Sequence, residues 1–243
     1  MELLRKEFTM KLGIMQPYFV PYIGYWQLMN LVDTYIFYDD VNYIKGGWIN
    51  RNRIFNNPTP IYFNIPLIKA SSNKKINEIQ VNIHSPFINK NLRTIENIYH
   101  KAPYYSEVYP LIKEICLCNK NNLAEYIIKS ISIIANYLDI HTNFIKSSEL
   151  EKNNALHGEE KILDICNRLN ANEYYNAIGG KSLYSFEHFN KHNIKLNFIK
   201  TNDIIYKQFN NIFYPNLSII DIMMFNNKKT ISNMLLDYTL INQ

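Results

Sequence analysis

A stiff, aromatic segment near the N-terminus carries the first side chains suited to ligand binding. Its sequence is Gln16-Pro17-Tyr18-Phe19-Val20-Pro21-Tyr22-Ile23-Gly24-Tyr25. Tyrosine rings stack on bases and sugar rings, and their hydroxyls orient a ligand through hydrogen bonds. We therefore predict that Gln16, Tyr18, Tyr22 and Tyr25 bind a substrate or a nucleotide. The alternative is an aromatic turn that only packs.

Two adjacent acids, Asp39 and Asp40, open a dense polar segment that extends to Arg53. Carboxylates at the end of a strand can bind a metal ion or ribose hydroxyls, and one of them can act as a general base. Adjacent strand residues point to opposite faces, so both acids enter one site only if the strand has already ended. We predict that at least one is catalytic; a helix cap or a surface turn is the alternative.

The same segment also contains cations and amides. Lys45 and Arg51 are suited to phosphate, and Arg51 and Arg53 are two of only five arginines in the chain. We group Lys45 with the predicted catalytic residues. The predicted ligand-binding residues of this segment are Trp48, Asn50, Arg51 and Asn52.

A pair of glycines, Gly179 and Gly180, precedes Lys181 and Tyr184. Paired glycines let backbone N–H groups approach an anion closely, and Lys181 adds a positive charge. We predict that all four residues bind the ligand. The spacing is not that of a P-loop, which disfavours an ATPase, and a plain glycine turn is the alternative.

Other chemistry finds little support in the residue pattern. The six histidines lack the spacing of a zinc site, so we predict no metal site. A thiol nucleophile is a weak possibility, since Cys166 and the pair Cys116 and Cys118 lie in apolar helical stretches. The glycine patterns of serine hydrolases and of ordinary NAD enzymes are absent.

The elements that position these residues alternate between strand and helix. We predict a buried strand at 11–16 that ends at Pro17, a helix at 22–32 and a strand at 35–38. Such a unit begins a parallel sheet, and the ligand crevice of an open parallel sheet lies at the carboxyl ends of its strands. The aromatic segment and the two acids both follow strand ends.

The remainder of the chain continues the pattern. We predict a loop-rich stretch at 41–60, strands at 61–65 and 79–83, and a helical insertion at 86–138. Strands near 144–145, 173–176 and 194–199 alternate with helices at 159–169 and 183–189, and helices at 218–225 and 230–236 close the chain. The predicted fold is α/β with a mostly parallel, Rossmann-like three-layer sheet. We predict a single domain over 1–243, with an N-terminal unit at 11–65 and a C-terminal α/β part at 143–240.

Composition limits the classes of protein. With 243 residues, 47% of them hydrophobic, the chain can build a sizeable core, and no apolar run approaches the roughly 18 residues that cross a bilayer. Three cysteines and the absence of an export signal predict a cytoplasmic protein without a membrane partner. The net charge of +5 is scattered along the chain, which favours a small anionic ligand over nucleic acid.

Taken together, these motifs resemble the WbqC-like protein family over about residues 11–240. The motifs are Gln16-Pro-Tyr-Phe-x-Pro-Tyr-x-Gly-Tyr25, Tyr38-Asp-Asp-Val41, Tyr43-Ile-Lys45, Trp48-Ile-Asn-Arg-Asn52, Ala102-Pro-Tyr104, Gly179-Gly180, Tyr206-x-Gln208 and Leu217-Ser-Ile-Ile-Asp221. Members of that family lie among bacterial surface-polysaccharide genes, especially those for O-antigen and lipopolysaccharide. The resemblance implies a cytoplasmic step on a nucleotide-linked sugar, with the motif positions as site residues.

Three functions follow as hypotheses. The first, implied by the resemblance, is an enzyme that transfers an acyl or aminoacyl group, such as glycyl, to the amine of a nucleotide-linked amino sugar. The second is a nucleotidyl-transfer or ATP-using enzyme, although the H-x-G-H signature of such enzymes is missing. The third is a non-catalytic protein that binds a nucleotide sugar and is a partner of a pathway enzyme. The sequence does not identify a cofactor or donor, and it leaves a homo-oligomer possible.

Overall fold

A six-stranded sheet forms the centre of the computed structural model, which describes residues 9–209 and 212–242. The strand order is β10-β9-β8-β1-β2-β7, and neighbouring strands are parallel except for β10, which pairs antiparallel with β9. These strands are β1 (Lys11–Met15), β2 (Thr34–Phe37), β7 (Asn143–Lys146), β8 (Glu173–Ala177), β9 (Lys195–Thr201) and β10 (Tyr238–Ile241). The fold is therefore a mostly parallel, Rossmann-like α/β fold, as predicted.

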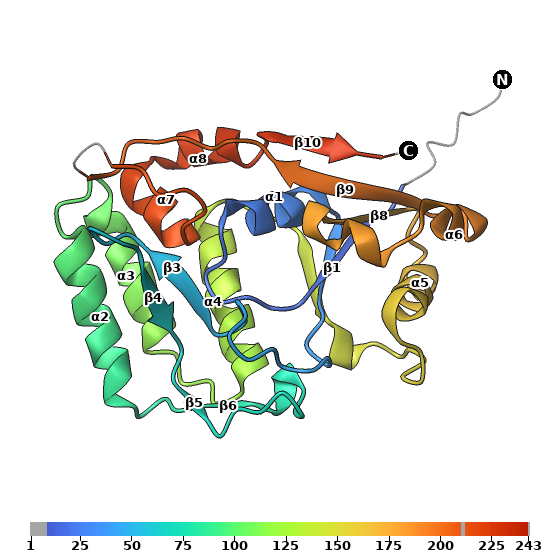
Figure 1. The fold of residues 1–243 in the computed structure, drawn as a ribbon, viewed down its shortest axis with the longest axis horizontal. Coiled ribbons are helices and arrows are strands. Elements are labelled where there is room, and N and C mark those ends of the chain that lie inside the picture. The colour runs from blue at the N-terminus through green and yellow to red at the C-terminus, as the bar shows by residue number, and fades with distance from the viewer. Residues whose placement is uncertain (1–8, 210–211, 243) are drawn as a thin grey trace.

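The two faces of the sheet belong to two apolar clusters. Successive strand residues point to opposite faces, so Tyr35 and Phe37 pack in one cluster while Ile36 packs in the other. Helices α1 (Ile23–Leu31) and α4 (Leu123–Tyr137) cover the first face, and α5 (Gly158–Arg168) and α6 (Phe186–Lys191) cover the second (Figure 1). The structure therefore has three layers, with the sheet between two layers of helices.

A long insertion lies between β2 and β7. It contains an antiparallel hairpin, a second small antiparallel pair, and the helices that pack beside α4 (Figure 1). Its elements are β3 (Arg51–Ile54), β4 (Ile61–Asn64), β5 (Leu67–Ile68), β6 (Gln80–Val81), α2 (Pro86–Tyr99) and α3 (Tyr105–Cys116). The predicted break in the helical part, at residues 102–103, falls between α2 and α3.

Two predicted segments need correction. The stretch 41–60 is not all loop, because Arg51–Ile54 forms β3 and pairs with β4. Although its sequence is largely polar, Arg51–Ile54 forms a strand in which the alternate residues Asn52 and Ile54 are buried. The helix predicted at 183–189 is a 3₁₀ turn at Ile178–Leu183 followed by α6 from Phe186, since the chain first turns around the two glycines.

The C-terminal part closes the sheet edge. Helices α7 (Ile219–Phe225) and α8 (Lys228–Met234) match the prediction, whereas the edge strand β10 was not predicted from its sequence.

Within the described ranges, none of the helices has the length and apolarity needed to cross a membrane.

One buried carboxylate joins the insertion to the C-terminal part. Asp221, at the start of α7, is fully buried, and its Oδ1 accepts a hydrogen bond from the Tyr99 hydroxyl at 2.7 Å. Its Oδ2 accepts bonds of 2.7 Å from the Tyr206 hydroxyl and from Gln208 Nε2. These three donors favour the charged form of Asp221. Burial has the larger effect and raises the pKa of its carboxyl group to about 6.

This raised pKa gives a testable pH dependence. An acid whose pKa is higher in the folded state stabilises the fold at low pH and loses that contribution as pH rises through the folded value. We expect the wild type to lose up to roughly 3 kcal/mol relative to Asp221→Asn between about pH 4 and pH 6. Urea unfolding of both proteins across this range measures it; a constant difference would contradict the assignment.

Candidate functional site

The largest of three described cavities, about 860 Å³, opens at the carboxyl ends of β1, β2 and β8. We call it the strand-end cavity. Residues that follow these strands and the residues of the β7–α5 connection line it, among them Gln16, Tyr18, Tyr38, Asp40, Asn176 and Tyr184. Its volume is within the range of about 300–1,000 Å³ that is typical of ligand pockets.

The position of this cavity follows from the strand order. β1 pairs in parallel with β2 on one side and with β8 on the other. The helix that follows β1, α1, covers one face of the sheet, whereas α6, which follows β8, covers the opposite face. The chain therefore leaves the two strands in opposite directions, and a crevice forms between them, as at the switch points of other open α/β sheets.

Asp40 is the acidic centre of the strand-end cavity. Its Oδ2 lies 3.0 Å from Lys152 Nζ and 3.5 Å from Lys161 Nζ, and all three side chains are nearly or wholly buried. The Lys152 ammonium also donates to the carbonyl of Ser147, which fixes it behind Asp40. Asp40 Oδ1 is buried and has no hydrogen-bond partner among the described residues. The two lysines thus hold Oδ2, whereas Oδ1 is enclosed and accepts no hydrogen bond from the described residues.

The charge on Asp40 is stabilised by these neighbours. Burial by itself raises the pKa of the carboxyl group, but the side chains of Ser147, Lys152 and Lys161 outweigh burial and hold the pKa below its usual value. At neutral pH the group is a carboxylate that accepts hydrogen bonds. Asp40 therefore brings a negatively charged hydrogen-bond acceptor to the cavity lining.

Asp39 has a different environment. Its carboxylate accepts hydrogen bonds from the backbone N–H of Ser148 at 2.9 Å, from the Ser148 hydroxyl at 2.6 Å and from Asn77 Nδ2 at 3.4 Å. It is almost fully buried and does not line the strand-end cavity. The two acids therefore face different surroundings, and only Asp40 faces the cavity.

The β8 side of the strand-end cavity is built around Asn176. Its Nδ2 donates to the hydroxyls of Tyr174 at 2.7 Å and Tyr184 at 3.2 Å. Gly180 passes so close that a Cβ there would lie 3.2 Å from Asn176 Oδ1. Gly179, Gly180 and Tyr184 all line the cavity.

A second cavity of about 430 Å³, the aromatic cavity, adjoins the first through Tyr18, which lines both. Most of its other lining residues come from the aromatic segment, from β3 and the residues just before it, and from the end of β9. They include Tyr22, Trp48, Asn52, Arg53, Lys200 and Thr201. The two cavities together offer a polar space and an aromatic space side by side.

The aromatic segment is held in a fixed conformation. Val20 has φ of 38°, a region that β-branched residues rarely adopt, and its carbonyl accepts a 2.6 Å bond from the Ser218 hydroxyl. Asn52 Nδ2 donates to the carbonyl of Phe19 at 3.3 Å. Gly24 leaves room for Tyr22 and Thr201, because a Cβ at Gly24 would lie 2.4 Å from Thr201 Oγ1. Strain of this kind is typical of functional sites.

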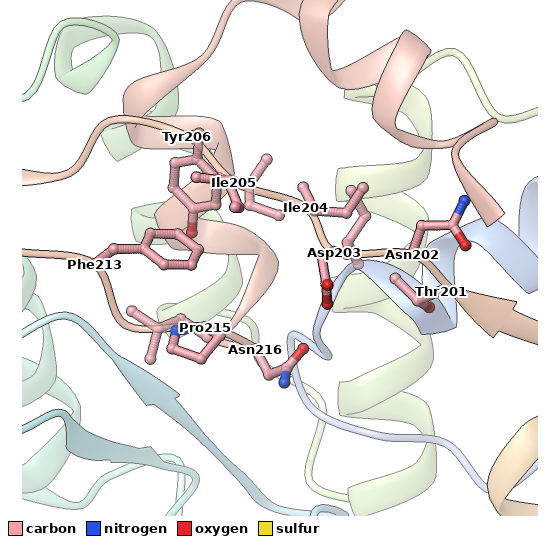
Figure 2. Close-up of a pocket in the computed structure, with 12 residues that line it drawn as sticks. Thr201, Asn202, Asp203, Ile204, Ile205, Tyr206, Phe213, Pro215 and Asn216 are labelled. Atoms are coloured by element: carbon pink, nitrogen blue, oxygen red, sulfur yellow. The ribbon is translucent and has the colours of Figure 1, made fainter.

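A third, smaller cavity of about 190 Å³ lies between residues 201–206 and 213–217. Figure 2 shows Tyr206 and Phe213 together at one end of it and Thr201 and Asn202 at the other. It shares Thr201 and Asn216 with the aromatic cavity. Because Tyr206 is bonded to Asp221, the buried network described above fixes one wall of this cavity.

Six of the predicted site residues line neither of the two larger cavities: Asp39, Tyr25, Lys45, Asn50, Arg51 and Lys181. The buried Tyr25 donates to the carbonyl of Gln16 at 2.9 Å. Asn50 accepts from the Tyr43 hydroxyl and donates to the carbonyl of Ile65. The Arg51 guanidinium donates to the carbonyls of Gly46 and Gly47 and lies 4.4 Å above the Tyr62 ring.

Other residues at the cavities were missed from the sequence. Lys152 and Lys161 lie more than 100 residues from Asp40, and isolated lysines in a lysine-rich chain carry no signal. Arg53 lies in the segment that we singled out, but β3 was not predicted. Without the strand, nothing indicated that Arg53 rather than Arg51 faces a cavity.

The described part of the chain gives little support for a metal site or for a reactive buried thiol. It contains no group of three or more His, Cys, Asp or Glu side chains that could hold a metal ion. Burial raises the pKa of the Cys116 and Cys166 thiols to about 12, and neither lines a described cavity.

Comparisons with known proteins found a family model and a relative that match the chain. The model of the WbqC-like protein family matches residues 16–233, a range that includes the lining residues of the three cavities except Ile14 and Met15. The chain is 27% identical over 216 residues to "Uncharacterized protein Rv1507c" from Mycobacterium tuberculosis, covering 88% of this chain and 92% of that protein. No solved structure matches the chain.

The buried ion pairs of Asp40 predict a stability effect. Removing one partner leaves a buried carboxylate poorly compensated, so Lys152→Met should destabilise the fold by roughly 3 kcal/mol at pH 7. The loss should shrink as pH falls through the carboxyl range. The lowered pKa of Asp40 stabilises the fold only while the carboxyl group is ionised, so this contribution disappears as the group becomes protonated. Urea unfolding at several pH values measures both effects.

A matched control is Lys146→Met, which removes the partly exposed partner of the exposed Glu149 carboxylate. An exposed ion pair contributes about 0–1 kcal/mol. Equal losses for the two lysine variants would contradict the role assigned to Lys152.

Proposed function

The chain belongs to the WbqC-like protein family, and we propose that it transfers an acyl or aminoacyl group to the amine of a nucleotide-linked amino sugar in the cytoplasm, as a step of bacterial surface-glycan synthesis. The observation that carries the proposal is Asp40, a residue of the strand-end cavity whose ionised carboxylate has one oxygen without a hydrogen-bond partner among the described residues. Glycyl is one possible acyl group.

The two adjoining cavities support a ligand with two unlike parts. The strand-end cavity has polar and charged groups such as Asp40 and Lys161 among apolar ones, and the aromatic cavity has rings and cations. A sugar is recognised by hydrogen bonds, whereas a base is recognised by stacking and a diphosphate by cations. A nucleotide-linked sugar contains all three parts.

In the proposed reaction, Asp40 Oδ1 accepts a hydrogen bond from the sugar amine. The nitrogen attacks the acyl carbon of the donor, a new N–C bond replaces the bond to the leaving group, and one proton passes from nitrogen to Asp40. The Lys161 ammonium, 3.5 Å from Asp40 Oδ2, stabilises negative charge that develops on the acyl oxygen. Base assistance of this kind contributes roughly 10²–10⁴-fold.

Thermal unfolding with a panel of ligands tests the substrate class. The panel holds dTDP-, UDP-, GDP- and CDP-linked sugars, ATP with Mg²⁺, and acyl-CoA donors. A ligand at 100 times its Kd should stabilise the fold by about 2.7 kcal/mol. Stabilisation by a nucleotide-linked amino sugar supports the proposal. Stabilisation by ATP with Mg²⁺ alone would favour nucleotidyl transfer. If no ligand stabilises the folded sample, the result would favour a non-catalytic partner protein over an enzyme.

The role of Asp40 predicts a separation of turnover from binding. Asp40→Asn should lower turnover about 10²–10⁴-fold and leave the Kd of the nucleotide sugar nearly unchanged, because an amide is a poor proton acceptor. Mass spectrometry of the N-acylated product measures turnover, and calorimetry measures Kd. Asp139→Asn is the control, since Asp139 is exposed, lines no described cavity and has φ of 56°, which Asn also adopts. Loss of binding equal to the loss of turnover would contradict the role.

A further inference from the structure

We propose that the aromatic cavity is the binding site for the nucleoside diphosphate part of the ligand, with Arg53 and Lys200 on the diphosphate and Trp48 against the base. This inference rests on the proposed function for the sugar, but the nucleotide site is testable without it. It assigns the phosphates to cations other than the predicted Lys45, Arg51 and Lys181.

Charge separates the two cavities. Arg53 and Lys200 line the aromatic cavity, and its described lining residues include no acid. The strand-end cavity, in contrast, has Asp40 and Glu159 beside Lys75 and Lys161. An anion therefore prefers the aromatic cavity, and an uncharged polar group with N–H or O–H donors suits the other.

The two cations of the aromatic cavity have no acidic partner. Among the residues that the structure describes, neither Arg53 nor Lys200 forms an ion pair, although Lys152 and Lys161 do. Arg53 Nε is buried and has no hydrogen-bond acceptor. A buried guanidinium N–H without an acceptor costs free energy, and a phosphate bound in the cavity would give the guanidinium group an anionic partner.

The indole of Trp48 supplies the stacking surface. Its exposed fraction is 44%, whereas Trp26, the second tryptophan of the chain, is fully buried. Arg53 Cζ lies 6.0 Å from the centre of the Trp48 ring. The centre of the Tyr62 ring, on β4, lies 6.5 Å from the centre of the Trp48 ring. Stacking against an aromatic side chain stabilises a bound base, which is a reason for a large exposed ring at a cavity.

This arrangement also orients the whole ligand. Tyr18 lines both cavities, so a nucleotide in the aromatic cavity directs its sugar past Tyr18 toward Asp40. The acceptor amine then reaches Asp40 Oδ1. The reverse orientation would place the diphosphate beside Asp40 and Glu159.

Titration calorimetry with UDP, dTDP, GDP, CDP and pyrophosphate tests the site. We expect at least one nucleoside diphosphate to bind, and Arg53→Gln and Lys200→Gln each to weaken its Kd about tenfold. Trp48→Ala should weaken the nucleoside diphosphate about tenfold and leave pyrophosphate, measured by competition, unchanged. Circular dichroism confirms that each variant is folded.

Matched controls are Lys195→Gln and Arg93→Gln. Lys195 is exposed at the opposite end of the strand that carries Lys200, and Arg93 is exposed on α2; neither lines a described cavity. We expect both to keep the wild-type Kd. Equal weakening by controls and site variants, or tight binding to the Arg53→Gln, Lys200→Gln double variant, would overturn the proposal, as would the failure of all five compounds to bind the folded protein.

The outcomes separate this proposal from the proposed function. Nucleotide binding at Arg53 and Lys200 without formation of an N-acylated sugar would leave the nucleotide site intact and refute the transferase. Formation of the N-acylated sugar with an unchanged Kd in both cation variants would do the reverse.

Discussion

The pairing of β1 with β2 on one side and with β8 on the other is the constraint on which the rest of the structure depends. Parallel strands end at the same edge, so the segments after β1, β2, β8 and β9 must all begin there. The connections then diverge to the two faces of the sheet, and the space between them is the strand-end cavity. Asp40 enters this space because β2 ends at Phe37, which places both acids after the strand.

The family motifs divide into residues of the cavities and residues of their frame. Tyr206, Gln208 and Asp221 form a buried hydrogen-bonded network with Tyr99, and Ser218 bonds to the carbonyl of Val20. These contacts fix the segments around the cavities without lining the strand-end cavity. Such buried polar networks specify one arrangement of the chain, and here they position the aromatic segment relative to β3.

Tyr35, Ile36 and Phe37 form a buried apolar run that ends shortly before Asp39 and Asp40. Sequence periodicity of this kind was sufficient for the five parallel strands of the sheet and for most helices. It failed at β3 and β10, whose strands are short and partly exposed. Residue type placed Gln16, Tyr18, Asp40, Trp48 and Tyr184 at a cavity. It could not separate Asp40 from Asp39 or Arg53 from Arg51, because their roles depend on long-range partners such as Lys152 and Ser148.

The central claim is that the strand-end cavity holds an amino sugar against Asp40 while the nucleotide occupies the aromatic cavity. A crystal structure of the protein with a bound UDP- or dTDP-linked amino sugar tests it most directly. The account predicts the amine nitrogen within hydrogen-bond distance, about 2.7–3.2 Å, of Asp40 Oδ1, and the diphosphate against Arg53 and Lys200. A sugar bound away from Asp40, with its diphosphate in the strand-end cavity, would contradict it.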